Sequence, residues 1–253
     1  MELKPIENTT IYGMDFFFQS IIKLYNEKKM PTKILLSGKK GIGKSTLAYH
    51  LSNYILSIDE KLSYDLDNFT INHQNKSFKL LQNGSHPNFY LIDLLNDKKN
   101  IDIAQIREMI NYTNKSTFNN KPRLILIDNL ENLNINSVNA LLKIIEEPNQ
   151  NIFFFLINNN EKKILPTLKS RCLEFKINFS FEETISITNN ILKFDTLKII
   201  NNELISYYSS AGDIINLINF SNQKKINLKD YNLINFLLLI IDNKYYKKNK
   251  LLK

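Results

Sequence analysis

The sequence predicts an α/β protein, with a parallel five-stranded sheet covered by helices and followed by a smaller all-helical part. Short apolar runs alternate with helix-spaced apolar residues over roughly the first 178 positions, as expected when crossover helices join parallel strands. A glycine-rich loop, Gly38 to Ser45, lies between the first apolar run and a helix. Beyond it, from about Asn178, only helical spacing remains, which predicts a domain boundary near 177–180.

The expected elements follow from these runs. Strands are expected at 34–36, 89–92, 124–127 and 152–157, with a fifth, buried strand starting at Cys172. Helices are expected at 47–55, 101–112, 138–145 (stopped by Pro148), 181–192, 197–208, 212–220 and 228–241. The polar stretch 57–88 is interpreted as an insertion or a long connection, because Gly84 and Pro87 interrupt it.

Composition excludes several classes of protein. The chain of 253 residues is 43% hydrophobic, which is typical of a globular protein. Its one cysteine, Cys172, rules out an internal disulfide and a four-cysteine zinc site. No run approaches the roughly 20 apolar residues of a membrane-spanning helix, and the N-terminus lacks a signal-peptide core. We therefore expect a cytoplasmic protein without a membrane partner and without zinc.

The net charge of +8 leaves two interpretations open. A basic chain is attracted to nucleic acid. The abundance of Asn, Lys and Ile equally fits the amino-acid bias of an AT-rich genome. Under such a bias, lysine replaces arginine except where a planar, permanently charged side chain is needed. The chain has only three arginines: Arg107, Arg123 and Arg171. The basic run 244–253 has two interpretations, a frayed end or a partner-binding tail.

The glycine-rich loop matches the phosphate-binding pattern G-x-x-x-x-G-K-[ST] and has the strand and helix that this pattern requires. Gly38, Gly41 and Gly43 let the backbone turn its N–H groups toward an anion. Lys44 would reach the β and γ phosphates of ATP, and Ser45 would hold Mg²⁺. We assign Thr46, the next residue, to the same site.

Asp128 follows the expected strand 124–127, where P-loop proteins place an acid that holds the metal. The next residue is Asn129, an amide that can orient water but is a poor base. Glu131 lies two positions further on and could point elsewhere. The sequence therefore supports nucleotide binding better than rapid hydrolysis.

Two ordered motifs resemble those of bacterial clamp-loader subunits, which are AAA+ P-loop proteins. Residues 139–148 (NALLKIIEEP) are similar to their N-A-L-L-K-x-L-E-E-P motif, and residues 165–172 (LPTLKSRC) to their L-P-T-I-x-S-R-C motif. His86-Pro87, residues 103–107 and residues 11–13 also resemble this family. The resemblance covers about 11–176 well and continues weakly to about 220.

The resemblance implies three parts: an AAA+ domain (1–178), a helical lid (179–222) and a reduced, collar-like tail (223–253). It implies ATP and Mg²⁺ as cofactors, with Tyr12 capping the adenine. Arg171 would act as an arginine finger on a neighbouring subunit's ATP, and Asn159 as a sensor-like residue. Expected partners are the gamma/tau and delta clamp-loader subunits and, through the complex, the sliding clamp and primer-template DNA.

Departures from the family decide the expected type. The chain has no zinc-binding cysteines, no glutamate after Asp128, and no arginine after Arg171 to serve as a lid sensor. These features favour a delta-prime-type subunit of the DNA polymerase III clamp loader, with weak or absent hydrolysis and no polymerase site of its own. An autonomous gamma/tau-type ATPase stays open as the alternative. The two motifs speak against a kinase-like P-loop enzyme.

Overall fold

The computed structural model describes residues 4–95, 98–115, 119–147, 149, 151–208 and 210–248. The chain divides into two compact units, which are described separately. The first consists of Glu2–Lys39 and Gly43–Ile177, and the second of Asn178–Lys253 together with Lys40–Ile42.

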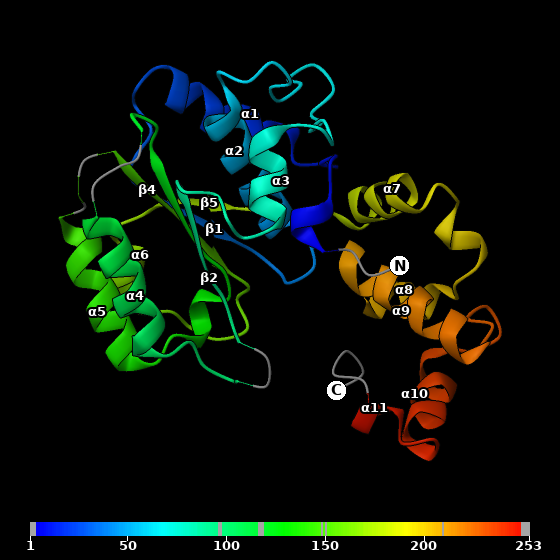
Figure 1. Cartoon of the computed structure of the whole chain (residues 1–253). Coiled ribbons are helices and arrows are strands. Elements are labelled where there is room, and N and C mark those ends of the chain that lie inside the picture. The colour runs from blue at the N-terminus through cyan, green and yellow to red at the C-terminus, as the bar shows by residue number, and fades with distance from the viewer. Residues whose placement is uncertain are drawn as a thin grey trace. The chain divides into compact units, whose positions relative to one another are not determined.

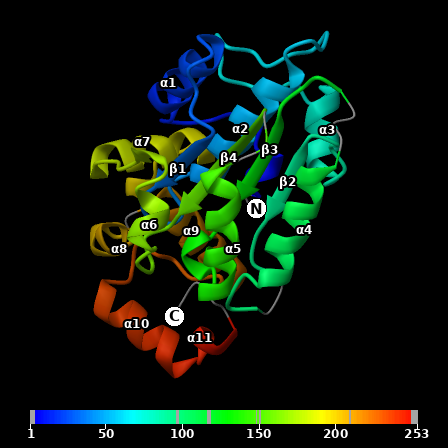
Figure 2. The same cartoon turned by 90° about the vertical axis from the view of Figure 1, so that its left-hand side faces the viewer.

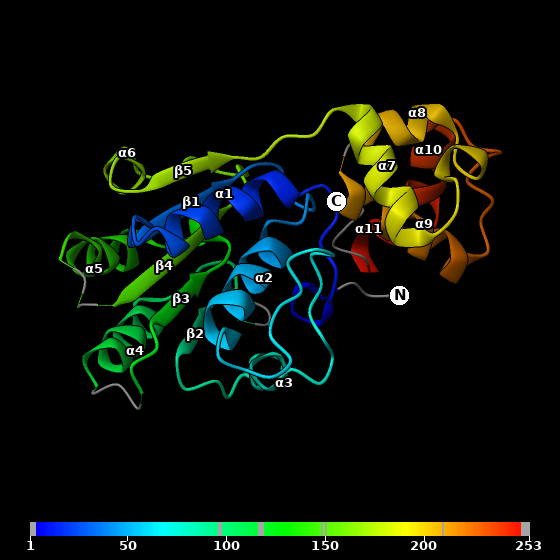
Figure 3. The same cartoon turned by 90° about the horizontal axis from the view of Figure 1, so that it is seen from above.

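The first unit is built on a parallel five-stranded sheet, as predicted, with the order β2-β3-β4-β1-β5 (Figure 3); Figure 2 shows β1 to β4 from another side. Its register pairs Leu35 of β1 with Leu156 of β4, and Ile125 of β3 with Phe154 of β4. The strands are β1 (Lys33–Ser37), β2 (Phe89–Ile92), β3 (Arg123–Ile127), β4 (Ile152–Asn158) and β5 (Leu173–Lys176).

Helices cover both faces of this sheet (Figures 1 and 3). One face carries α4 and α5, whose Ile106, Met109 and Leu141 join a buried cluster with alternate strand residues such as Ile125 and Phe154. The other face carries α1 and α2. The helices of this unit are α1 (Asp15–Asn26), α2 (Lys44–Ser57), α3 (Lys76–Gln82), α4 (Ile103–Asn114), α5 (Ile135–Glu146) and α6 (Pro166–Lys169), with 3₁₀ turns η1 (Pro5–Glu7) and η2 (Leu130–Asn132).

Two sequence expectations fail in this unit. The stretch 57–88 is not simply irregular, because Asn75 caps α3 by accepting a hydrogen bond from the backbone N–H of Phe78. The strand after Cys172 is not buried: β5 is an edge strand, and Leu173 is 40% exposed. An edge strand has one neighbour only, so less of its surface is covered. Pro148, the expected helix stop, lies outside the described residues.

Arg123 illustrates why an arginine persists in a lysine-rich chain. Its side chain is buried, and Nη1 lies 2.7 to 3.1 Å from the carbonyl oxygens of Tyr112, Thr113 and Lys115 at the end of α4. The guanidinium also stacks over the ring of Tyr112. Nη1 therefore pairs carbonyl oxygens that a helix end leaves unpaired, while the delocalised guanidinium lies over the Tyr112 ring. The compact ammonium of lysine does not offer both contacts at once.

The second unit is all-helical (yellow to red in Figure 1). Its helices share one apolar core that includes Ile185, Leu204, Leu217 and Phe236. The elements are α7 (Phe181–Leu192), η3 (Thr196–Lys198), α8 (Asn202–Tyr207), α9 (Ala211–Lys224), α10 (Leu233–Asp242) and α11 (Tyr245–Lys248). Among the described residues, no helix has the length and apolarity needed to cross a membrane.

Two predicted helices of this unit are shorter than expected, because asparagine caps restart the helix. Asn201 accepts a hydrogen bond from the N–H of Glu203, so the expected helix 197–208 divides into η3 and α8. Asn232 accepts one from Asn235, so α10 begins at Leu233 and not at Leu228. The side-chain amide oxygen of asparagine can accept a hydrogen bond from a backbone N–H group in the first turn of a helix, which allows a new helix to begin there.

Candidate nucleotide-binding site

The phosphate loop connects β1 to α2, as the sequence predicts. Gly43 precedes the helix with φ of 100°, a left-handed conformation that only glycine adopts readily. Gly43, the residue before α2, makes no side-chain cap, and the first N–H groups of a helix that begins in this way can bind an anion. Lys44 is buried, and its Nζ donates to the carbonyl oxygens of Gly38 and Lys39 at 2.8 and 2.7 Å.

Gly41 makes contacts that the phosphate-binding pattern of the loop does not predict. Residues 40–42 group with the second unit, where the N–H of Gly212 donates to the Gly41 carbonyl oxygen at 2.9 Å. A Cβ on Gly41 would lie 2.5 Å from the hydroxyl oxygen of Ser210, and its φ of 80° is left-handed. Gly41 therefore serves a close approach to the start of α9, which the loop pattern does not predict. Its part in phosphate binding stays a prediction.

Ser45 and Asp128 meet at the ends of their elements. The Ser45 hydroxyl donates to Oδ2 of Asp128 at 2.5 Å, and the backbone N–H of Asn129 donates to Oδ1 at 2.7 Å. Burial raises the pKa of the Asp128 carboxyl above its ordinary value, although the Ser45 bond opposes that shift. A hydroxyl beside a carboxylate offers the hard oxygen ligands that Mg²⁺ prefers alongside phosphate oxygens. These residues therefore fit Mg²⁺ bound together with a nucleotide.

A chain of hydrogen bonds links the ends of three strands beside this pair. Asn129 donates from Nδ2 to Oδ1 of Asp93 at 2.6 Å, just beyond β2. Asn159, just beyond β4, donates from Nδ2 to Oδ1 of Asn129 at 3.0 Å. A carboxylate accepts only, so the Asp93 bond fixes which end of the Asn129 amide carries the N–H groups. Both ends of the Asn129 amide are therefore engaged by protein groups.

Asn159 is the member of the run Asn158-Asn159-Asn160 that contacts this chain. Asn158 and Asn160 bond instead to each other, with Nδ2 of Asn158 donating to Oδ1 of Asn160 at 2.8 Å. Through its bond to Asn129, Asn159 lies one residue from Asp128, and its sensor-like role stays a prediction.

Glu131 and Asp93 are site residues that sequence reasoning did not assign. Glu131 is 7% exposed, and its Oε2 accepts the backbone N–H of Asn159 at 3.1 Å. Its other oxygen, Oε1, has no hydrogen-bond partner among the described residues. Glu131 thus points toward the end of β4 and fixes the backbone of Asn159. The only available signal was position: acids that follow apolar strands of a parallel sheet gather at one edge.

The N-terminal segment is attached to α2 close to the loop. Asn8 donates from Nδ2 to the Thr46 hydroxyl at 3.4 Å, and its carbonyl oxygen lies 3.0 Å from Nε2 of the buried His50. Tyr12 is half-buried in this segment. Thr46 therefore holds the segment that carries Tyr12, and its assignment to direct nucleotide contact stays a prediction.

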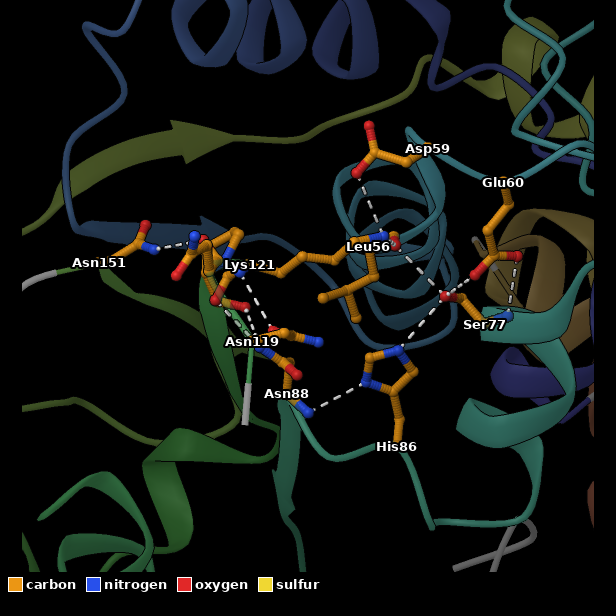
Figure 4. Close-up of polar contacts among 11 residues, drawn as sticks. Leu56, Asp59, Glu60, Ser77, His86, Asn88, Asn119, Lys121 and Asn151 are labelled. Carbon is orange, nitrogen blue, oxygen red and sulfur yellow. Dashed lines mark hydrogen bonds and ion pairs between the residues drawn. The ribbon is translucent and has the colours of Figure 1, made fainter. Parts of the chain in front are cut away.

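A polar network around Ser77 secures the far end of α2 (Figure 4). The Ser77 hydroxyl donates to Oε1 of Glu60 at 2.6 Å and lies 3.3 Å from Nε2 of His86. The N–H of Asn88 donates to Nδ1 of His86, so the imidazole proton is on Nε2 and points at Ser77. This polarity is the reverse of that in a serine nucleophile, whose hydroxyl must donate to the histidine. The network is structural.

Lys121 completes this anchor. Its Nζ donates to the carbonyl oxygen of Leu56 at 2.8 Å and forms an ion pair with Asp59 at 3.6 Å (Figure 4). A cation at the carboxyl end of a helix also complements the helix dipole. The helix that begins at the phosphate loop is therefore fixed at both ends.

Arg171 lies apart from the loop, directly after α6. Its Nη2 forms an ion pair with Oε1 of Glu146 at 2.7 Å, and its Nη1 donates to the carbonyl oxygen of Thr167 at 2.8 Å. The side chain is 38% exposed. The neighbouring Cys172 packs against the core cluster of the sheet, and burial raises the pKa of its thiol to about 11, which makes it unreactive.

Comparison with known proteins identifies the family. The model of the family described as DNA polymerase III, delta subunit, matches residues 14–180. A DNA polymerase III subunit delta' of Buchnera aphidicola (Schizaphis graminum) is 29% identical over 246 residues, covering 93% of this chain and 71% of that protein. The subunit gamma of the same organism is 32% identical over 239 residues, covering 90% and 62%.

The crystal structure of a gamma subunit-related DNA polymerase III protein of Thermotoga maritima is also similar, with 18% identity and a TM-score of 0.49. The matched region covers 80% of this chain and 57% of the Thermotoga maritima chain. The family match, residues 14–180, includes the phosphate loop, Asp128 and Arg171. The chain therefore belongs to the family of AAA+ clamp-loader subunits of DNA polymerase III.

Proposed function

We propose that this chain is a delta-prime-type clamp-loader subunit that binds ATP with Mg²⁺, turns it over slowly or not at all, and supplies Arg171 to a neighbouring subunit's ATP. The observation that carries the proposal is the amide at position 129. Asn129 stands beside Asp128, where a carboxylate would be needed to accept a proton from the attacking water. Its amide is already engaged by Asp93 and Asn159.

Nucleotide binding is supported by the loop itself. Lys44 and Ser45 are positioned by α2, and Asp128 accepts the Ser45 hydroxyl. Lys44 would exchange its two carbonyl partners for phosphate oxygens, and the loop N–H groups would bind the same phosphates. The chain thus keeps the residues that bind a nucleotide and lacks the one that would activate water.

The partners we propose are the gamma/tau and delta subunits and, through the assembled complex, the sliding clamp and primer-template DNA. The second unit offers apolar surface for assembly: Ile234, Leu238 and Ile241 share a face of α10 and are each more than half exposed. Residues 223–248 share a core with the preceding helices, which supports a tail joined to the lid. Direct contact between the lysines and DNA stays a prediction.

Size exclusion with light scattering tests the assembly. We expect a mixture of this chain with the organism's gamma-type and delta subunits to form one complex that contains a single copy of this chain. ATP turnover by the isolated chain should be negligible, while a fluorescent ATP analogue should bind. A chain that stays monomeric beside the other subunits would contradict the proposed assembly.

A gamma-type ATPase is the second candidate, favoured by the 32% identity to a subunit gamma. The two functions differ in which residue limits ATP turnover. Lys44→Ala should abolish turnover if this chain is the ATPase. In a delta-prime-type subunit, Arg171→Ala should lower the turnover of the complex far more than Lys44→Ala does.

A further inference from the structure

The two sequence motifs that resemble the family meet in one ion pair. Glu146 is the last residue of α5, in the first motif, and Arg171 follows α6, in the second. The guanidinium is held from two sides, by the Glu146 carboxylate at 2.7 Å and by the carbonyl oxygen of Thr167 at 2.8 Å. Both bonds lie within the first unit, so they belong to the subunit that carries the arginine.

Two anchors on two helices restrict a side chain that would otherwise sample many rotamers. Arginine loses little freedom per bond because its fork is planar and rigid. It has five N–H donors, so one bond to Thr167 and one to Glu146 do not exhaust them. With 38% of the side chain exposed, the fork is both fixed and reachable by an external anion.

We propose that Glu146 is a positioning residue for Arg171, which holds the guanidinium in the orientation in which it acts on a neighbouring subunit's ATP. The inference rests on the proposed trans role of Arg171. Orienting a catalytic cation in advance removes an ordering cost from the reaction. Glu146 contacts no nucleotide in this proposal and acts only through the arginine.

The neighbouring acids do not share this role. Glu174 is engaged by the Ser37 hydroxyl at 2.7 Å and by Lys169 at 3.0 Å. Glu147 is exposed and, within the described part of the chain, forms no ion pair. Glu147→Gln therefore removes the same charge one position along the chain without touching Arg171, which makes it a matched control for Glu146→Gln.

The test uses the complex reconstituted from full-length subunits with the sliding clamp and primed DNA, and measures steady-state ATP turnover. Arg171→Ala defines the part of the rate that depends on this arginine. We expect Glu146→Gln to lower that part about two- to five-fold, the range typical of half-exposed ion pairs. KM for ATP should stay unchanged, and Glu147→Gln should match the wild type.

A salt series separates positioning from a merely structural effect. The difference between the wild type and Glu146→Gln should shrink as ionic strength rises, because salt screens an exposed ion pair. Melting temperatures and complex masses of both glutamine variants should equal those of the wild type. Loss of stability in Glu146→Gln alone would overturn the inference.

The remaining outcomes are also decisive. A rate for Glu146→Gln equal to that of Glu147→Gln would overturn the positioning role while leaving the trans arginine intact. A faster rate would show that Glu146 restrains Arg171, which also overturns it. If Arg171→Ala leaves turnover unchanged, the proposed function fails first, and the role of Glu146 falls with it.

Discussion

Replacing Asn129 by Asp tests the hydrogen-bond chain at the ends of the strands. In the wild type, Nδ2 of Asn129 donates to Oδ1 of Asp93 at 2.6 Å. The substitution keeps the shape but sets two carboxylates against each other. At about 4 Å and an effective dielectric constant of about 20, two like charges repel by about 4 kcal/mol. That energy corresponds to a pKa raised by about 3 units for one of the two acids.

The sign of the pH dependence follows from linkage. The folded variant retains a proton that the unfolded chain releases above pH ~4, so the free energy of unfolding falls as pH rises toward ~7. We expect Asn129→Asp to lose about 1–2 kcal/mol relative to the wild type at pH 5, and about 4 kcal/mol at pH 8. Urea unfolding followed by far-ultraviolet circular dichroism at the two pH values measures both differences.

The exchanged pair, Asp93→Asn with Asn129→Asp, is the control. It restores one carboxylate and one amide, so its stability should return to within about 1 kcal/mol of the wild type at both pH values. An equal loss at pH 5 and pH 8 for the single variant would refute the reasoning. So would an exchanged pair as unstable as Asn129→Asp.

Three further predictions concern other parts of the first unit. Lys44→Ala should weaken binding of a fluorescent ATP analogue roughly 10- to 150-fold, the value of a charged hydrogen bond. Burial lowers the pKa of His50 and of His86 to about 4. The free energy of unfolding should therefore fall as pH drops from about 6.5 toward 4, by about 1–2 kcal/mol per histidine at pH 5. In urea titrations, His50→Gln or His86→Gln should make the free energy of unfolding depend less on pH over this range. Arg123→Lys should cost about 2–4 kcal/mol in the same assay, because the compact ammonium of lysine cannot keep both the bonds to the carbonyls at the end of α4 and the position over Tyr112. No loss would contradict its capping role.

Much of the fold could be predicted because the strands are short, buried and apolar. Four of them lie within one residue of their expected ends. Three of these, β1, β3 and β4, are buried almost throughout, whereas β2 is an edge strand in which Leu91 is 42% exposed. Helix α1 was missed although Phe18, Ile21 and Ile22 have helical spacing and are buried. Its signal was present in the sequence. The signal for helix α3 is weaker, because this helix has only seven residues and lies in a polar stretch.

The candidate site was predictable only where a motif fixes it. Gly38 to Ser45 follow from a spacing pattern, and Asp128 follows from its place directly after an expected strand. Asp93 and Glu131 do not, because their contacts join the ends of different strands and of a 3₁₀ turn. Such contacts depend on strand order, which the sequence does not state. The partner of Arg171 was hidden for the same reason, as 25 positions separate it from Glu146.

The neighbours of the amide at 129 explain it as well, beside the proposed loss of a base. A glutamate there would bring a second charge to Asp93, whereas the amide gives Asp93 a donor and gives Asn159 an acceptor. Asp93 already raises the pKa of Asp128, so a further carboxylate would oppose ionisation of the residue that is to hold Mg²⁺. With Asn129, the Asp128 carboxyl stays easier to ionise than it would be beside a further carboxylate. An amide at position 129 thus agrees with the proposed function, in which the chain binds a nucleotide with its metal and turns it over slowly or not at all.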